Sequence, residues 1–126
     1  MKLVLKGRFP SLNEVIAITK GHWSQYSKMK KELTISVALE ARVQRMKPVK
    51  GGKVKVVFHW YEKDWRRDVD GICGWAQKPI LDGLVEAGVL PTDGRKNCVA
   101  ELDHVFPDPD KDNPRVVVEI VELIGC

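Results

Sequence analysis

Two things are scarce in this sequence, long apolar runs and cysteine. No stretch approaches the about 18 apolar residues that a membrane-spanning helix requires, so we expect no membrane partner. Residues 1–6 are too short a leader for a signal peptide, and we therefore expect a cytoplasmic protein. The three cysteines, Cys73, Cys98 and Cys126, show no CxxC spacing and form an odd set. This pattern argues against disulfides and a cysteine-ligated zinc site, and it predicts free thiols.

Aromatic residues make up only 7% of the 126 residues, whereas hydrophobic residues make up 44% and charged residues 30%. These proportions are typical of globular proteins and exclude disordered, collagenous and coiled-coil chains. The chain shows no internal repeats, linkers or low-complexity segments. Its length is below that at which a second domain is expected, so we predict a single domain over residues 1–126.

The net charge of +4 conceals an uneven distribution of charge along the chain. Residues 1–67 contain 16 Lys and Arg residues against 5 Asp and Glu residues, whereas residues 68–126 contain 5 against 12. A basic half can bind a polyanion such as nucleic acid, and an acidic half can bind a cation. The alternative is that the two halves only present solvated faces of opposite sign.

The hydrophobic patterns predict an α+β fold with the order strand, helix, strand, helix, strand, strand. Alternation and a β-branched or aromatic composition predict strands over 2–8, 53–61, 98–106 and 115–123. Four-residue spacing of apolar residues predicts helices over 24–46 and 80–87. Lys78 and Pro79 open the second helix and Gly88 ends it. The aspartate-rich segment 107–114 is interpreted as a hairpin loop rather than a calcium loop.

The sequence Asp68-Val69-Asp70 is the first candidate for chemistry. Two carboxylates one residue apart raise each other's pKa unless a counter-charge is present, and a divalent metal supplies that charge. Mg²⁺ takes a few carboxylate oxygens and keeps waters for a phosphate ligand, an arrangement common in phosphodiester hydrolysis. The alternative for this fragment is a helix N-terminus, where aspartate is favoured by the macrodipole.

Lys78, Asp82 and Asp93 are further candidates. Lys78 and Asp82 are four residues apart and share one helix face, so they either form an ion pair or place a lysine beside a metal site, where it balances charge on a phosphate. Asp93 lies in the turn sequence Pro91-Thr92-Asp93-Gly94, where aspartate is usually a cap.

Short motifs occur in a characteristic order over about residues 7–120. They are Pro10-Ser11-x-Asn13, Arg67-Asp68-x-Asp70, Lys78-x-x-x-Asp82-Gly83-Leu84, Gly88-Val89-Leu90 and Asp93-Gly94. In order and spacing these motifs resemble the RusA-type Holliday-junction resolvases of bacteria and their prophages. The combination is far more specific than any one of its fragments.

The resemblance implies a RusA-like domain, a small mixed β-sheet packed with helices, that acts as a homodimer on four-way junction DNA. It also implies an endodeoxyribonuclease that depends on Mg²⁺, with Mn²⁺ as the alternative ion. Carried over by position, Asp68, Asp70 and Asp93 are the metal-site and catalytic carboxylates. Lys78 is the catalytic lysine, and Asp82 is a supporting acid at the metal.

The basic half of the chain supplies the predicted DNA contacts. We expect phosphates to be bound mainly by side chains of the first helix and the charged loop at 61–67, namely Lys28, Lys30, Lys31, Arg66 and Arg67. Trp65 lies in that loop and is interpreted as packed, with stacking on an unpaired base as the alternative. The three histidines show no ligand spacing, so we expect them to be solvated or hydrogen bonded rather than catalytic.

A homodimer needs an apolar surface, and the sequence offers two. The 24–46 helix carries a second apolar row beyond the one that a small sheet would cover, made of Ile35, Leu39, Val43 and Met46. The 53–61 strand offers Phe58 and Trp60.

Two other functions remain open at this point. A basic DNA-binding protein without catalysis would explain the charge of the first half, but it leaves Asp68 and Asp70 unexplained. A metal-dependent nuclease of other branched or single-stranded nucleic acid would use the same carboxylates and differ only in surface shape.

Overall fold

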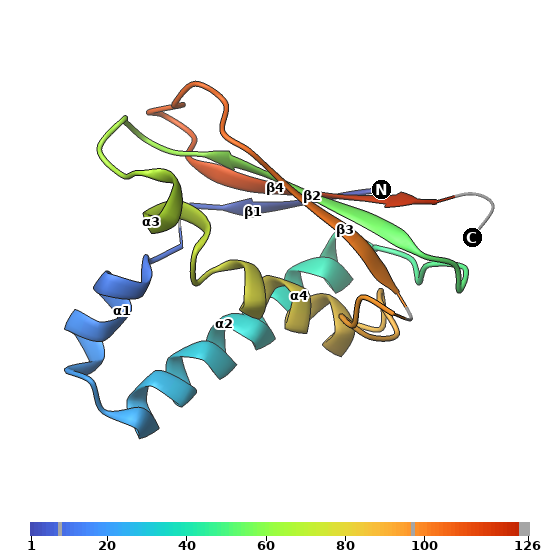
Figure 1. Ribbon diagram of the computed structural model, residues 1–126, viewed down its shortest axis with the longest axis horizontal. Coiled ribbons are helices and arrows are strands. Elements are labelled where there is room, and N and C mark those ends of the chain that lie inside the picture. Colours follow the sequence, from blue (N-terminus) through green and yellow to red (C-terminus); the bar gives the residue numbers. More distant parts are fainter. Residues whose placement is uncertain (8, 97, 124–126) are drawn as a thin grey trace.

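A four-stranded mixed β-sheet forms one layer of the molecule, with the strand order β1–β4–β2–β3 (Figure 1). The strands are β1 (Lys2–Lys6), β2 (Val54–Tyr61), β3 (Val99–Val105) and β4 (Arg115–Glu122). β4 runs antiparallel to both β1 and β2, whereas β3 pairs with β2 in parallel. The structure is a computed structural model that describes residues 1–7, 9–96 and 98–123.

The helices lie together on one side of the sheet (Figure 1). They are α1 (Leu12–Thr19), α2 (Trp23–Val43), α3 (Val69–Cys73) and α4 (Gln77–Glu86). Within the described ranges, none of them is both long and apolar enough to cross a membrane. α2 and α4 confirm the two predicted helices, and Gly88, at φ 77°, ends the second one as expected.

Alternate side chains of the strands point toward the helices and form the core. β1 contributes Leu3 and Leu5, and the inner strands contribute Val54, Val56, Phe58, Trp60, Val116, Val118 and Ile120. From the other side, α2, α3 and α4 contribute Val37, Ala41, Ile72, Ile80, Leu81 and Leu84. Each large side chain buried in this way stabilises the fold by about 1.5–3 kcal/mol. The result is a single α+β domain in which three helices pack against a mixed sheet, as predicted from the order of elements.

α1 is absent from the prediction, and α3 is present only as the alternative of a helix N-terminus at Asp68. The signal for α1 is a capping box at Ser11: its side-chain oxygen accepts a hydrogen bond from the Glu14 N–H at 3.1 Å, and the Glu14 carboxylate accepts one from the Ser11 N–H at 3.3 Å. The spacing Ser-x-x-Glu is visible in the sequence and predicts a helix that the pattern of apolar residues does not reveal.

The hairpin predicted over 107–114 is wrong, because β3 and β4 are not neighbours. β2 lies between them, and the connection from β3 crosses the end of β2. β3 exposes Ala100, Glu101, Leu102 and Asp103 in succession, which suits an edge strand, whereas β4 buries every second residue and suits the interior. Adjacency along the chain therefore does not give adjacency in this sheet.

Of the two apolar surfaces proposed for a dimer, one is buried and the other is exposed. Phe58 and Trp60 are buried in the core, so the expectation that they meet a partner is wrong. In contrast, Ile35, Leu39 and Val43 of the second row on α2 are exposed, while Met46 packs against the core. An apolar stripe at i, i+4 and i+8 therefore remains open on α2.

The cysteines agree with the prediction as far as the structure describes them. Cys73 and Cys98 are free thiols, and burial raises the pKa of each. Cys126 lies outside the described residues. The sulfur atoms of Cys73 and Cys98 are therefore mainly protonated and packed.

Candidate functional site

The ammonium group of Lys78 joins Asp82 and Asp93 into one cluster. Lys78 Nζ lies 3.0 Å from Asp82 Oδ1 and also contacts Asp93 Oδ2. Lys30 of α2 approaches the other oxygen of Asp82 at 3.9 Å. The cluster therefore contains two carboxylates and two lysines, drawn from α2, α4 and the loop between α4 and β3.

The local sequence of α4 positions Lys78 and Asp82. Lys78 and Pro79 lie in the first turn, where a residue without a backbone N–H is tolerated because the first N–H groups of a helix have no intrahelical acceptor. Lys78 and Asp82 are four residues apart and so lie on the same face. This part of the prediction, a helix opened by Lys78 and Pro79 that carries Asp82, is confirmed.

Gly83 explains why Lys30 reaches Asp82. A Cβ atom at Gly83 would lie 2.6 Å from Val37 Cβ and 2.9 Å from the Thr34 carbonyl oxygen. Only glycine allows α2 and α4 to approach this closely, and the close approach brings the lysine-bearing face of α2 to the second turn of α4. Asp82 is therefore the neighbour, in sequence, of the residue at which α2 and α4 make their close contact.

The loop that carries Asp93 is tied to the start of β3. The Gly94 carbonyl accepts hydrogen bonds from the N–H groups of Cys98 and Val99, both at 3.1 Å, and the Gly94 N–H donates to Thr92 Oγ1 at 3.1 Å. This turn fixes the backbone beside Asp93. The contact with Lys78 holds the side chain of Asp93 toward α4.

The charges of the cluster shift the titration of its members. The hydrogen bond from Lys78 lowers the pKa of Asp93, and partial burial opposes this effect. Conversely, the hydrogen bonds to Asp93 and Asp82 raise the pKa of Lys78. Lys78 and Asp93 are therefore both charged over the whole physiological pH range.

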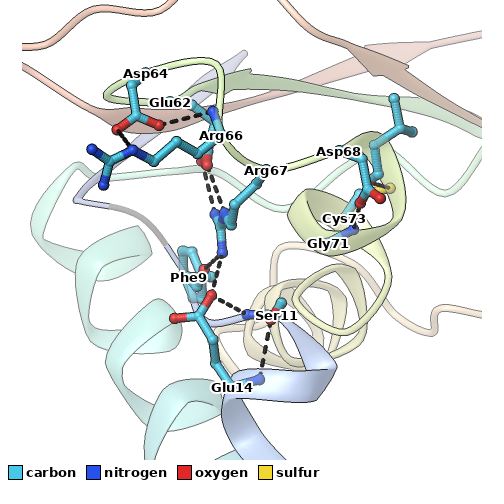
Figure 2. A network of polar contacts seen from close by, with 11 residues as sticks. Phe9, Ser11, Glu14, Glu62, Asp64, Arg66, Arg67, Asp68, Gly71 and Cys73 are labelled. Carbon is cyan, nitrogen blue, oxygen red and sulfur yellow. Dashed lines mark hydrogen bonds and ion pairs between the residues drawn. The ribbon is translucent and has the colours of Figure 1, made fainter.

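Asp68 and Asp70 lie apart from this cluster, on α3. Asp68 is the N-cap, and its Oδ1 accepts a hydrogen bond from the Gly71 N–H at 2.9 Å (Figure 2). Asp70 lies in the first turn of the helix. The alternative interpretation of this fragment, a helix N-terminus, is thus confirmed as a structural fact. Both residues are exposed.

The structure divides the four predicted acids into two pairs. α3 follows the end of β2, whereas the loop with Asp93 precedes the start of β3, and these lie at opposite ends of the sheet (Figure 1). Over 1–7, 9–96 and 98–123 no three His, Cys, Asp or Glu side chains gather closely enough to hold a metal ion. The expected three-aspartate set of Asp68, Asp70 and Asp93 is therefore not assembled in this conformation.

The fit to Mg²⁺ rests instead on Asp82 and Asp93. Mg²⁺ sites commonly use one or two protein carboxylates and complete the octahedron with waters and substrate phosphates. The Asp82 and Asp93 carboxylates both contact the ammonium group of Lys78, so they lie near each other. Their half-exposed position leaves access for water and for a phosphate.

Arg67, one of the predicted DNA contacts, has a structural role, because its guanidinium group is engaged within the protein. Its Nε and Nη2 donate to the two oxygens of Glu62 at 2.7 and 2.8 Å, and Nη1 donates to the Phe9 carbonyl at 2.7 Å and to Glu14 at 3.1 Å (Figure 2). Only 11% of the side chain is exposed. Burial opposes its charge, but the hydrogen bonds and charges of Glu62 and Glu14 outweigh this and raise its pKa. Arg67 thus connects the loop after β2 to the start of α1.

The other predicted DNA contacts are on the surface. Lys28 and Lys31 are exposed on α2, and Lys28 lies 4.0 Å from Glu32. Arg66 is exposed in the loop after β2, 3.7 Å from Asp64. Exposed pairs of this kind are weak and leave the cations free to exchange partners with a phosphate.

The aromatic residues separate into buried and exposed ones. Trp60 and Trp75 are buried, as expected, and Trp60 Nε1 donates to His104 Nδ1 at 2.9 Å, so His104 is a hydrogen-bonded histidine. Trp65 is 77% exposed, so its interpretation as packed is wrong. Trp23, which no sequence motif singles out, is 76% exposed at the start of α2.

Comparisons with known proteins add no identification. No family model matches the chain, and no curated protein matches it significantly.

Proposed function

We propose that this protein is a divalent-metal-dependent endonuclease of branched DNA, with a four-way junction as its substrate. The observation that carries the proposal is the Lys78–Asp82–Asp93 cluster, which lies against the basic face of α2 through Lys30. The motifs that resemble the RusA-type resolvases include all three cluster residues, and this makes four-way DNA the first substrate to test.

Two carboxylates on the basic surface that we propose faces DNA need a chemical explanation. Carboxylates repel phosphates, so a surface that serves only to bind DNA gains nothing from Asp82 and Asp93 beside Lys30 and Lys78. The two acids become useful when they hold a cation between the protein and the phosphate. Bound Mg²⁺ supplies an activated water and neutralises charge on the phosphate.

The residues of this chain have distinct tasks in such a site. Asp82 and Asp93 hold the ion, and Lys78, at hydrogen-bonding distance from both, stays protonated because they raise its pKa. A protonated lysine donates to a phosphate oxygen and balances the charge that develops there. Asp68 and Asp70 stay proposed metal-site acids on the resemblance alone, because α3 holds them at the opposite end of the sheet from the loop with Asp93.

The second candidate is a DNA-binding protein without catalysis. Its support is that each carboxylate of the cluster already has a lysine partner, as in an ordinary surface ion-pair network. Under this alternative the basic face of α2 binds phosphates and the acids only fix the position of Lys30 and Lys78.

A gel assay separates these functions. A synthetic four-way junction and a linear duplex of the same sequence are incubated with the protein in Mg²⁺, in Mn²⁺ or in EDTA. We expect paired, symmetric cuts in the junction with Mg²⁺ and none in EDTA. Binding of the junction without cuts in either metal would favour the second candidate, and cuts in flaps or single strands in preference to the junction would leave a nuclease with a different substrate.

A further inference from the structure

A groove runs between α2 and α4 beside the candidate metal site. Its α2 wall is formed by Trp23, Tyr26, Ser27, Lys30 and Lys31, and Asp82 lies in the opposite wall. The α2 residues follow the spacing i, i+3, i+4, i+7 and i+8, so they form one continuous face of the helix. The groove therefore leads from an exposed tryptophan past two lysines to a member of the cluster.

The tryptophan at the end of this groove, Trp23, stacks on a neighbouring aromatic ring but is not buried. The Trp23 ring stacks on Tyr26 with centroids 5.8 Å apart and an interplanar angle of 18°. Tyr26 is itself fixed, because its hydroxyl accepts a hydrogen bond at 2.9 Å from Nε1 of the buried Trp75. The indole thus has one supported face and remains largely exposed, so its other face is open to a stacking partner.

The charges of the groove are arranged by wall. The α2 wall presents the cations Lys30 and Lys31, whereas the α4 wall presents Asp82 and Glu86. Lys30 and Lys78 both contact Asp82, so the acidic wall is partly neutralised where it meets the cluster. A phosphate backbone in this groove is attracted to the lysines of α2 and repelled by the carboxylates of α4, so it lies along the α2 wall.

We propose that this groove binds an unpaired segment of a DNA strand, with one base stacked on Trp23 and the adjoining phosphates at Lys30 and Lys31. DNA as the ligand class rests on the proposed function. Single strands are the matching form, because a base offers its π-face to an aromatic side chain only when it is unstacked, and every base has such a face. Unpaired nucleotides at a branch point would be led by this groove toward Asp82.

The test measures binding without cleavage. A short fluorescein-labelled oligothymidylate and a duplex of the same length are titrated in EDTA with the native protein and with Trp23→Ala, and fluorescence anisotropy gives the affinities. Trp23→Ala should weaken single-strand binding at least about fivefold and change duplex binding much less. Trp23→Phe, which keeps a ring, should retain most of the affinity.

Leu102→Ala is the control, because Leu102 is an exposed apolar residue on the edge strand β3 and lies outside the groove. Circular dichroism of each variant verifies its fold. Equal losses in Trp23→Ala and Leu102→Ala, or an equal loss for duplex and single strand, would overturn the proposal. Since the readout needs no metal, Trp23-dependent binding by a protein that cuts nothing would support the groove and refute the nuclease.

Discussion

Arg67 and Glu62 form a bidentate ion pair, with Nε donating to Oε1 at 2.7 Å and Nη2 donating to Oε2 at 2.8 Å. The same guanidinium holds the Phe9 carbonyl, so one side chain ties the loop after β2 to the segment before α1. Asp68, the cap of α3, is the next residue in the chain. The pair therefore secures the region from which α3 presents its acids.

Replacing Arg67 by lysine should destabilise the fold. Lysine keeps the charge but cannot make the planar two-bond contact with Glu62 or satisfy Phe9 and Glu14 at the same time. We expect Arg67→Lys to lower the free energy of unfolding by about 2 kcal/mol. Urea denaturation measures this, with Arg66→Lys as the control, because the side chain of Arg66 is exposed. Equal stabilities of the two variants would contradict the structural role of Arg67.

The Lys78–Asp93 pair predicts a particular dependence of stability on pH. The pKa of Asp93 is lowered in the folded state below its ordinary value of 3.8 by the hydrogen bond from Lys78. The unfolded chain therefore takes up the proton first, so the contribution of Asp93 is present above pH 3.8 and is lost as the pH falls toward the lower folded pKa.

Urea denaturation of the native protein and of Asp93→Asn at a series of pH values measures this contribution. The difference in unfolding free energy should be below about 1 kcal/mol, because the pair is partly exposed, and it should shrink on acidification below the ordinary pKa. A difference that is the same at acid and neutral pH would show that the pair does not contribute through its charge.

The carboxylates predict the behaviour of cleavage variants. Asp93→Asn preserves shape and removes one charge from the cluster, so junction cleavage in Mg²⁺ should fall by about 10²-fold or more while junction binding is kept or strengthened. Asp70→Asn should have the same effect if α3 contributes to the metal site, as the resemblance implies. Asp112→Asn, an exposed acid in the loop between β3 and β4, is the control and should cut normally. Unchanged cleavage in both Asp93→Asn and Asp70→Asn would refute the assignment of the site.

The basic face of α2 predicts the salt dependence of DNA binding. Lys28 and Lys31 are exposed, and within the described part of the chain neither pairs with an acid of the cluster, so the double variant Lys28→Ala, Lys31→Ala removes cations without disturbing Asp82. The slope of log affinity against log salt concentration should fall by about one unit for each phosphate that the variant no longer binds. Lys111→Ala, on the distant loop after β3, should leave the slope as it is. An unchanged slope in the α2 variant would show that this charge is only a solvated face.

We also predict a homodimer that uses the exposed stripe of α2. Two cuts related by two-fold symmetry need two sites, and this chain has one set of candidate residues, which a closed two-fold pair would double. Sedimentation should give about twice the chain mass of 14.3 kDa. Leu39→Glu combined with Val43→Glu should shift the protein to monomer, whereas Val121→Glu, exposed on the sheet, should not. A monomer that still makes paired, symmetric cuts would contradict the argument from substrate symmetry.

Features with a short sequence range were predictable. The spacing of apolar residues over 24–46 predicted α2, and Lys78, Pro79 and Gly88 predicted the ends of α4, because helix periodicity and helix caps depend on residues within a few positions of each other. The pairing of Lys78 with Asp82 belongs to the same class, since a four-residue step on a helix is a local distance.

Features that join distant segments required the folded molecule. The guanidinium group of Arg67 is bound within the protein because Phe9 and Glu14, more than fifty residues earlier, meet it beyond the end of β2. Phe58 and Trp60 point inward because β2 lies between β4 and β3 and faces the helices. Neither outcome leaves a trace in the neighbouring sequence.

The grouping of the acids shows the difference most clearly. Asp68, Asp70, Asp82 and Asp93 look alike in the sequence, and their types and spacing were enough to mark them as candidates. Whether they act together depends on how the helices and loops that carry them pack in the folded protein. Gly83 decides part of this packing, because it lets α2 approach α4 closely. Asp93 joins Asp82 and Lys78 because the turn at Gly94 is anchored to β3, whereas Asp68 is engaged in capping α3. Local chemistry identifies the residues, and packing over long sequence distances selects which of them meet.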